Sequence, residues 1–352
     1  MANFYAGLPP RSFWRKAVGE RTIFNLQGLY SAKFEIARGD AIAAAGSCFA
    51  QHVSAQLRRR GFNILDVEPP PDHLSEAEAR DMGYGVYSAR YGNIYTVRQF
   101  LQLIRDAQAD AVRPEDFLHN RGRWFDLLRP TIEPTGFESL DEAVFARRDH
   151  LQSVRRLFSE ARLVVFTLGL TEAWLNKASG TVYPILPDTL NDVDSGTYAF
   201  HNFSYGEIAA DLRELYRLLD AQSPGLRLLL TVSPVPLTAT ASGQHVMVAT
   251  TYSKSVLRAV CGEMEAEFAD VDYFPSYEVI TSPLGRGIFY EPNMRGITQM
   301  GVDVAMATFF AEHDRDPLAA SGSPVTRQDR ALTGQSEDDV VCEEILLDAF
   351  SR

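Results

Sequence analysis

The sequence predicts an α/β fold in which helices cover both faces of a mostly parallel β-sheet. Short apolar runs alternate with amphipathic stretches along the 352 residues, and this alternation is typical of parallel strands joined by crossover helices. A hydrophobic content of 45% over this length is enough to build a large buried core. These two observations indicate a folded chain with one elaborate domain or two smaller ones.

The strands are predicted from short apolar runs that end at turn-forming residues. The first core strand is AIAAAG, residues 41–46, and the runs RLVVFTLGL (162–170) and LRLLLTVSP (226–234) give two more. Shorter strands are expected within residues 63–68 and 271–280. The near-continuous apolar character of the three core strands fits a sheet that is buried on both faces.

The helices are predicted where apolar residues recur every three to four positions. The strongest such pattern is EIAADLRELYRLLDAQ, residues 207–222. The other helices are expected at residues 49–62, 96–108, 150–161, 253–268 and 297–313. We therefore predict one domain over residues 1–313, with an N-terminal extension and insertions. Residues 314–352 are polar and contain Gly, Ser and Pro, so we predict a disordered acidic tail there.

Charge and composition argue against several classes of function. The net charge of −12 and the isoelectric point near 5.1 argue against binding to nucleic acid. No window approaches the roughly 18 apolar residues that a membrane helix needs, and the N-terminus lacks the apolar core of a secretory leader. The three cysteines have neither the spacing of a zinc site nor that of a disulfide framework. We expect a cytoplasmic protein without a metal or cofactor.

The first candidate for chemistry lies where the first strand meets the first helix. Ligands of parallel α/β sheets bind beyond the carboxyl ends of the strands, and AIAAAGSCFAQHV places Gly46 and Ser47 at such an end. A serine there can present its hydroxyl beside helix amides that stabilise an oxyanion. The alternative is that Ser47 only caps the helix. Cys48, the next residue, is expected to point into the core.

Several segments of the sequence resemble the GSCFA domain family, which belongs to the SGNH-hydrolase-like group. GSCFA itself stands at residues 46–50, and the resemblance covers roughly residues 25–312 through YSARYGNIYTVRQFLQL, FTLGLTEAW, TVSPVPLTAT, YSKSVLRAV and YFPSYEVI. The resemblance implies a flavodoxin-like or SGNH-like three-layer α/β/α sandwich. It also implies ester chemistry on acylated substrates, with carbohydrates as the expected class.

The resemblance also implies roles for individual residues. Ser47 resembles the nucleophile of the SGNH group, and Gly92 or Asn93 matches the glycine that offers a backbone amide to the oxyanion. Gly169 and Thr171 lie in GLTE, where the group has Gly-x-Asn-Asp, so Thr171 would replace the oxyanion-binding asparagine. A threonine hydroxyl can donate one hydrogen bond, and such a donor lowers the barrier by about 3–4 kcal/mol.

The sequence departs from the SGNH pattern just before the last helix, where that group has Asp-x-x-His. The corresponding residues are NMRG (293–296), so the usual base and its acidic partner are missing. A serine without a base is a poor nucleophile at neutral pH. Two histidines in strand-end loops are candidates for the base, His245 first and His201 second. Glu172 and Glu291 are candidate acids to orient it.

Further side chains near these loops are candidates for substrate contacts. Trp174 can stack on a sugar ring, and packing in the core is the alternative. Arg90, Arg295 and Lys254 can hold an anionic group such as a phosphate, with a structural ion pair as the alternative. The residues assigned to substrate binding are Glu172, Trp174, Arg90, Asn293 and Arg295.

These inferences together predict a serine-dependent O-acyl esterase or acyltransferase that acts on an acylated carbohydrate or polysaccharide precursor. Its partners would be an acylated saccharide or a small ester, together with an acyl donor if the reaction is a transfer. The alternative is a non-catalytic module that binds carbohydrates or nucleotide sugars on a degenerate SGNH-like fold. The vacated acid/base position at residues 293–296 favours this alternative.

Overall fold

A computed structural model describes residues 4–186 and 195–314 of the chain. The predicted C-terminal tail lies outside these residues, apart from Asp314. The Asp314 carboxylate lies 2.8 Å from the guanidinium of Arg38, and its side chain is only 4% exposed. Asp314 therefore still belongs to the folded part of the chain.

A four-stranded parallel sheet forms the centre of the fold. The strand order is β1–β4–β8–β9, formed by Ile42–Gly46, Leu163–Leu168, Arg227–Val232 and Val271–Tyr273. These strands confirm the parallel sheet that the apolar runs predict. The strand predicted at 63–68 is wrong in extent, because only Ile64 bridges Ile42 and the amide of Val67 donates to Ser88 instead.

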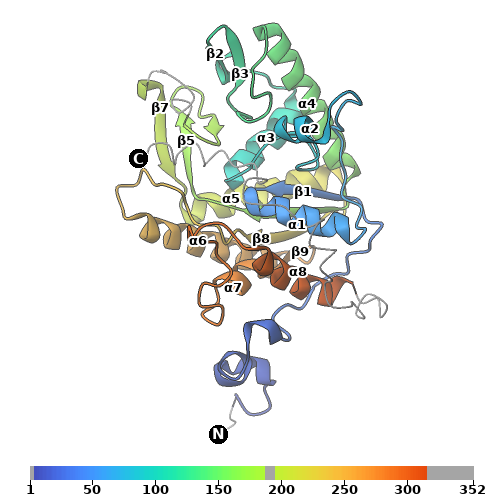
Figure 1. Cartoon of the computed structure of the whole chain (residues 1–352), viewed down its shortest axis with the longest axis vertical. Helices are drawn as coiled ribbons and strands as arrows, with labels where there is room; N and C mark the ends of the chain where they lie inside the picture. Colours follow the sequence, from blue (N-terminus) through green and yellow to red (C-terminus); the bar gives the residue numbers. More distant parts are fainter. Residues whose placement is uncertain (1–3, 187–194, 315–352) are drawn as a thin grey trace.

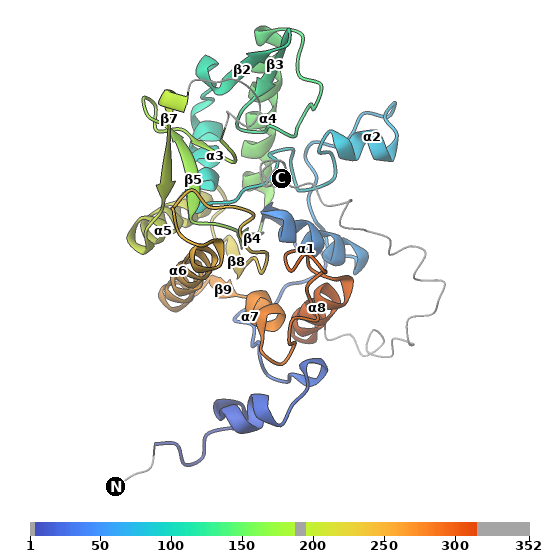
Figure 2. The ribbon, with the colours of Figure 1, turned by 60° about the vertical axis from the view of Figure 1, so that its left-hand side comes forward.

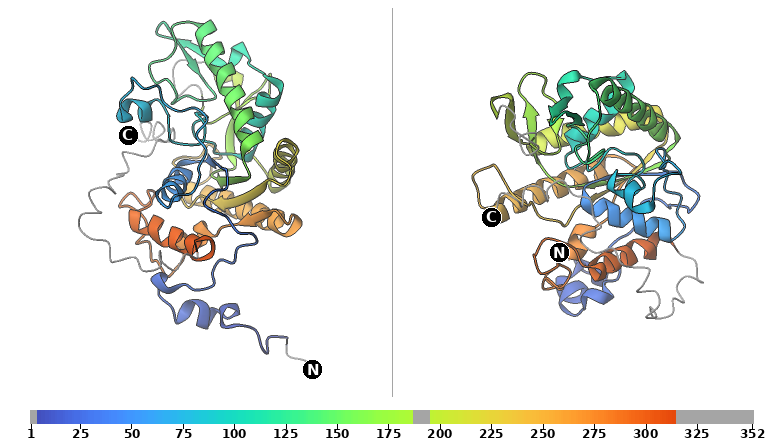
Figure 3. Two further views of the ribbon diagram at one scale, coloured as in Figure 1. Left: turned by 90° about the vertical axis from the view of Figure 1, so that its right-hand side faces the viewer. Right: turned by 45° about the horizontal axis from the view of Figure 1, so that its top comes forward.

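Helices cover both faces of this sheet, which gives a three-layer α/β/α arrangement (Figures 1 and 2). Side chains of β4 alternate between the layers, with Val164 and Phe166 in one core cluster and Leu163 and Val165 in the other. The first cluster includes residues of α3 (Val97–Ala109), α4 (Leu140–Glu160), α5 (Tyr205–Gln222) and α6 (Val246–Glu267). The second includes α1 (Cys48–Arg59), α7 (Ser276–Thr281) and α8 (Gln299–His313), and α1 and α8 lie side by side (Figure 3).

Two helices begin earlier than the sequence predicts. The α4 helix begins at Leu140 rather than at residue 150, because the hydroxyl of Ser139 caps it by accepting from the amide of Glu142. The α6 helix begins at Val246 rather than at residue 253. Its first turns, VMVATT, are rich in β-branched residues, whose helix propensity is low, so the sequence gives no signal of the true start.

Insertions add structure that the sequence analysis does not predict. A hairpin of β2 (Phe117–Asn120) and β3 (Arg123–Asp126) stands beside α4, and a short helix, α2, covers Glu76–Asp81. A separate antiparallel sheet has the order β6–β5–β7, formed by Val182–Tyr183, Glu172–Asn176 and Tyr198–Asn202.

The N-terminal extension projects away from the body of the molecule (Figures 1 and 2). None of the described residues 4–22 is buried. Among the described residues, no helix combines the length and the apolar character required to cross a lipid bilayer.

The buried pair of His150 and Glu68 is expected to make stability depend on pH. His150 Nδ1 lies 2.8 Å from Glu68 Oε2, and burial lowers the pKa of His150 from 6.5 to about 4. As the pH falls from about 7 to about 4, the unfolded chain gains a proton on this histidine that the folded chain does not, so the free energy of unfolding decreases. Urea unfolding across this range measures the effect. His150→Gln should show a shallower pH dependence, and an unchanged slope in that variant would contradict the assignment.

Candidate active site

The loops that follow β1, β4 and β8 converge on a small pocket at the carboxyl edge of the sheet. Ser47 directly follows β1, Gly169 follows β4 and Ser233 follows β8. This is the edge at which the sequence predicts the site. The pocket is lined by Ser47, Cys48, Tyr95, Gly169, Leu170, Ser233, Val235 and Lys254.

The hydroxyl of Ser47 is not used to cap the helix that it precedes. Ser47 occupies the N-cap position of α1, but its side chain makes no capping hydrogen bond. In contrast, the side chains at the N-caps of four other helices, Thr96, Ser139, Ser204 and Thr298, each accept a hydrogen bond from a backbone amide of the helix that follows. The structure therefore does not support the capping role for Ser47, whose side chain lines the pocket instead.

The backbone of Ser47 is held by neighbouring segments. Its amide donates to Thr167 O of β4 at 3.4 Å, and its carbonyl accepts from the hydroxyl of Tyr87 at 3.2 Å. One residue earlier, Gly46 O accepts from the amide of Ile94 at 2.9 Å. Because these contacts come from different elements, the position of the serine is fixed before any ligand binds.

Gly169 forms the wall of the pocket next to the serine. A Cβ atom at this position would lie 3.1 Å from Ser47 Oγ, so any larger residue would crowd the hydroxyl. The amide of Gly169 donates to Tyr95 O at 3.1 Å, and the amide of Leu170 donates to the same oxygen at 2.8 Å. Gly169 therefore gives the serine space, while its own amide is already bonded within the protein.

Lys254 places an amine in the same pocket. Its side chain comes from the first half of α6, is only 1% exposed, and donates from Nζ to Gly169 O at 2.7 Å. The preceding residue, Ser253, accepts from the amide of Thr171 at 3.0 Å, so both residues hold the turn after β4. Lysine is rarely this deeply buried without a structural or functional reason. From the sequence, Lys254 is a candidate only for binding an anion.

Neither histidine proposed as the base is among the residues that line this pocket. His245 is exposed and caps α6, where its Nδ1 accepts from the amide of Met247 at 3.2 Å. His201 lies on β7, and its Nε2 is 2.8 Å from the carboxylate of Glu207. Both side chains thus have local structural partners, and the structure does not bring them to Ser47.

The residues expected to bind the oxyanion are only partly gathered. Gly169 lines the pocket, whereas Gly92, Asn93 and Thr171 do not. Asn93 Oδ1 accepts from the hydroxyl of Tyr87 at 2.5 Å, beneath the serine backbone. Gly92 is buried with a φ of +70°, a conformation that favours glycine. The Thr171 hydroxyl is fully buried and has no hydrogen-bond partner within the described part of the chain.

The residues assigned to substrate binding do not line the pocket and make structural contacts instead. The carboxylate of Glu172 accepts from the hydroxyl of Thr240 at 2.7 Å, and burial raises the pKa of Glu172. Trp174 packs edge-to-face on Phe200 in the β6–β5–β7 sheet. Arg90, in turn, forms an ion pair with Glu133 at 2.7 Å.

The segment 293–296, where the SGNH pattern would have its base and acid, forms a turn. Asn293 Oδ1 accepts from the amides of Arg295 and Gly296 at 2.8 and 2.9 Å. The turn thus uses the asparagine oxygen to satisfy backbone amides, as such residues commonly do in loops. Neither Asn293 nor Arg295 lines the Ser47 pocket.

Two residues that line the pocket are not predicted as site residues in the role that the structure suggests. Ser233 is not selected from the sequence, and Lys254 is assigned only to anion binding. Ser233 is the first residue after β8, and the rule that ligands bind beyond strand ends would have selected it. The sequence contains no comparable pattern that would select Lys254, because the position of its side chain depends on where α6 begins and on how that helix packs. Cys48 is buried as predicted, yet it lines the pocket. Within residues 4–186 and 195–314, no group of three or more His, Cys, Asp or Glu side chains is placed to hold a metal ion.

Comparison with known proteins identifies the family of this chain. The sequence profile of the GSCFA family matches residues 41–309. The chain belongs to the GSCFA family. The match runs from β1 into α8, so it includes all residues that line the Ser47 pocket of this GSCFA protein.

Matches beyond the family are sparse. No curated protein matches the chain. Among solved structures, the crystal structure of an acetyl esterase mutant with an acetate ion is similar, with 12% sequence identity and a TM-score of 0.27. The alignment covers 45% of the GSCFA chain and 62% of the esterase chain, so it spans less than two thirds of that protein.

Proposed function

We propose that this GSCFA protein is a serine-dependent esterase or acyltransferase that cleaves or transfers an O-acyl group, with Ser47 as the nucleophile and Lys254 as the proton acceptor. One observation carries the proposal: the Ser47 hydroxyl, which does not cap α1, shares a pocket with the deeply buried amine of Lys254. The proposed substrate class is an acylated carbohydrate or carbohydrate precursor, as the resemblance to SGNH enzymes implies.

Lys254 suits the role of base because of its surroundings. An amine that is shielded from water can exist in the neutral form, which is the form that accepts a proton, and serine–lysine pairs are a known variant of the serine triad. The hydrogen bond from Nζ to Gly169 O orients the amine beside the wall that faces Ser47 Oγ. A neutral amine in this position donates one N–H to Gly169 O, and its lone pair is the proton acceptor in the proposed reaction.

The proposed reaction has two halves. In the first, Lys254 Nζ takes the hydroxyl proton as Ser47 Oγ bonds to the acyl carbon, and the ester carbonyl becomes an oxyanion. The oxyanion collapses, the bond to the alcohol breaks, and the lysine ammonium returns its proton to the departing alkoxide. In the second half, water or another alcohol attacks the acyl-serine and loses its proton to Lys254. The new oxyanion collapses, the bond between the acyl carbon and Ser47 Oγ breaks, and Lys254 returns the proton to Ser47 Oγ as an acid or a new ester leaves.

Two features of the chain favour the developing negative charge. Ser47 stands at the N-terminus of α1, a twelve-residue helix whose dipole places partial positive charge there. Lys254 is cationic once it has accepted the serine proton, so it adds a full charge in the same pocket.

A serine-directed fluorophosphonate probe tests the nucleophile. We expect one label per chain, located by mass spectrometry on the peptide that contains Ser47, and no label on a folded Ser47→Ala variant. Cys48→Ala is the matched control, because Cys48 lines the same pocket and its loss should leave labelling intact. Labelling that persists in Ser47→Ala would rule out this serine as the nucleophile.

A second candidate function is the non-catalytic carbohydrate-binding module. It is favoured by the turn at 293–296, which supplies neither acid nor base, and by the fact that neither candidate histidine lines the pocket. Folded wild-type protein that binds an acetylated saccharide but takes up no probe would support the module over the enzyme.

A further inference from the structure

The N-terminal arm, defined as residues 4–22, exposes large apolar side chains to solvent. It projects from the body of the molecule (Figures 1 and 2), and the exposed fractions are 89% for Phe4, 42% for Leu8 and 70% for Trp14. Phe24, at the base of the arm, is 64% exposed. Single exposed apolar residues are common on proteins, but several on one short segment mark a surface that a partner covers.

The arm also carries an excess of positive charge. Glu20 is its one carboxylate, and its cations are Arg11, Arg15, Lys16 and Arg21. Glu20 pairs with Arg15 at 2.7 Å. Within residues 4–186 and 195–314, no carboxylate forms an ion pair with the other three cations.

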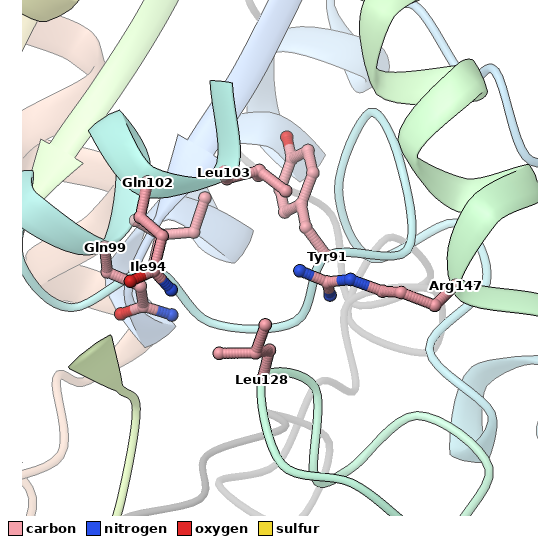
Figure 4. Close-up of a pocket in the computed structure, with 7 residues that line it drawn as sticks. All are labelled: Tyr91, Ile94, Gln99, Gln102, Leu103, Leu128 and Arg147. Carbon is pink, nitrogen blue, oxygen red and sulfur yellow. The ribbon is translucent and has the colours of Figure 1, made fainter. Parts of the chain in front are cut away.

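The buried cations in the body of the molecule, in contrast, have carboxylates beside them. Arg147 lines a small internal space with Tyr91 and Leu128 (Figure 4), and it lies 3.5 Å from the carboxylate of Asp126. The same carboxylate accepts from Arg129 at 2.8 Å. The described structure offers no such pairing to most of the arm cations, so a partner of the arm should combine negative charge with apolar side chains.

The last part of the chain has this composition. Residues 337–350, EDDVVCEEILLDAF, contain six carboxylates and no basic residue, and most of their other side chains are aliphatic or aromatic. We call these residues the acidic segment. It lies outside the described residues, and its charge is opposite to that of the arm.

The base of the arm lies next to the point where the C-terminal part of the chain begins. The hydroxyl of Tyr30 is 2.9 Å from Nε2 of His313, which is the last residue of α8. Ile23 is buried in the core cluster that also contains Phe309 and Phe310 of α8. The arm therefore leaves the body beside this helix (Figures 2 and 3).

The connection between α8 and the acidic segment is long enough to reach the whole arm. It consists of residues 315–336, 22 in number. At about 3.3 Å per residue, such a length of chain can span up to about 70 Å, whereas the 19 residues of the arm extend at most about 60 Å. Because both segments start from one place, each is present at a high effective concentration near the other.

We propose that the acidic segment binds the N-terminal arm of the same chain. Its carboxylates pair with the arm cations, and its apolar side chains cover those of the arm, Trp14 above all. An anionic membrane would also attract the arm cations, but the net charge of −12 on the whole chain opposes its approach to such a surface. The proposal does not depend on whether Ser47 is reactive.

Cys342 lies inside the acidic segment and allows a disulfide test on the full chain. The other two cysteines, Cys48 and Cys261, are buried. Ser12→Cys adds an exposed thiol to the arm, and Ser179→Cys is the matched control, exposed in the turn after β5. With oxidised glutathione as the oxidant, we expect the disulfide from position 12 to Cys342 to form at least about 10-fold faster than that from position 179. Peptide mass spectrometry identifies each bond, and non-reducing gels should show monomers.

Two changes in the Ser12→Cys chain separate binding from mere proximity of the two ends. Leu346→Ser combined with Phe350→Ser removes apolar side chains without a change of charge, and it should slow the bond at position 12 at least about 3-fold. Sodium chloride at 1 M should slow it similarly, because it screens the charges. Neither change should affect the Ser179→Cys chain.

Three outcomes would overturn the proposal. The first is a bond at position 12 that forms as slowly as the control or whose rate neither change affects. The second is disulfide-linked dimers, which would assign the acidic segment to the arm of a second copy. The third is no bond at position 12 together with sedimentation of the wild-type protein with phosphatidylserine vesicles, which would assign the arm to a membrane surface.

Discussion

Lys254→Met is expected to lower kcat/KM for a chromogenic acetyl ester at least about 100-fold, the scale of a lost general base. Methionine is similar in length to lysine and fits a buried site, so the change removes the amine with little loss of packing. The variant should keep a small residual rate, which steady-state assays beside the wild type can measure.

Three further variants distinguish a base at Lys254 from a mere charge there and from a histidine base. Lys254→Arg keeps a cation that cannot deprotonate in proteins, so it should be nearly as slow as Lys254→Met. His245→Ala and His201→Ala should stay near the wild-type rate, although His245→Ala removes the cap of α6 and costs about 1 kcal/mol of stability. A 100-fold loss in either histidine variant, with an active Lys254→Met, would assign the base to that histidine as the sequence analysis does.

Gly46→Ala is expected to lower the free energy of unfolding by at least about 4 kcal/mol, which is exceptional for one methyl group. Gly46 ends β1 opposite Thr167, and a Cβ there would lie 2.5 Å from Thr167 O and 2.8 Å from Thr167 Cβ. Its φ of +143° is in addition a conformation that other residues adopt only under strain. Urea unfolding compared with the wild type measures the loss.

Gly61→Ala is the control that measures the effect of a positive φ alone, without a steric contact. Gly61 also has a positive φ, +77°, after the end of α1, but a Cβ there would meet no atom within 4 Å. Its substitution should cost only about 1 kcal/mol. If the two alanine variants were equally stable, steric contact between β1 and β4 would not be the reason for glycine at position 46.

The core of the fold follows from the sequence because it depends on local pattern. The continuous apolar runs at 162–170 and 226–234 correspond to β4 and β8, and the periodic stretch at 207–222 corresponds to α5. Buried parallel strands and amphipathic helices leave such patterns wherever they occur. The β6–β5–β7 sheet leaves a weaker pattern, because its strands pair across a long connection and two of them keep half-buried faces.

The candidate site is predictable only in part. Ser47 was selected because it directly follows an apolar strand and stands in the motif of the family. Chain position alone assigns the base to loop histidines, whereas in the structure His245 serves as a helix cap and His201 binds Glu207. The resemblance places Thr171 in the oxyanion site, yet its hydroxyl is buried and Thr171 does not line the pocket.

The sequence by itself determined the layered architecture, the edge of the sheet where chemistry is expected, and the serine that stands there. Those features are local, because a strand end and the residue after it are neighbours in the chain. Only the tertiary structure decided that the amine of Lys254 shares the pocket with Ser47 and that Tyr30, near the base of the N-terminal arm, contacts His313 at the end of α8. Such pairings join residues that are far apart in the chain, or depend on a helix that starts earlier than its sequence indicates, so helix packing sets them and no local pattern records them.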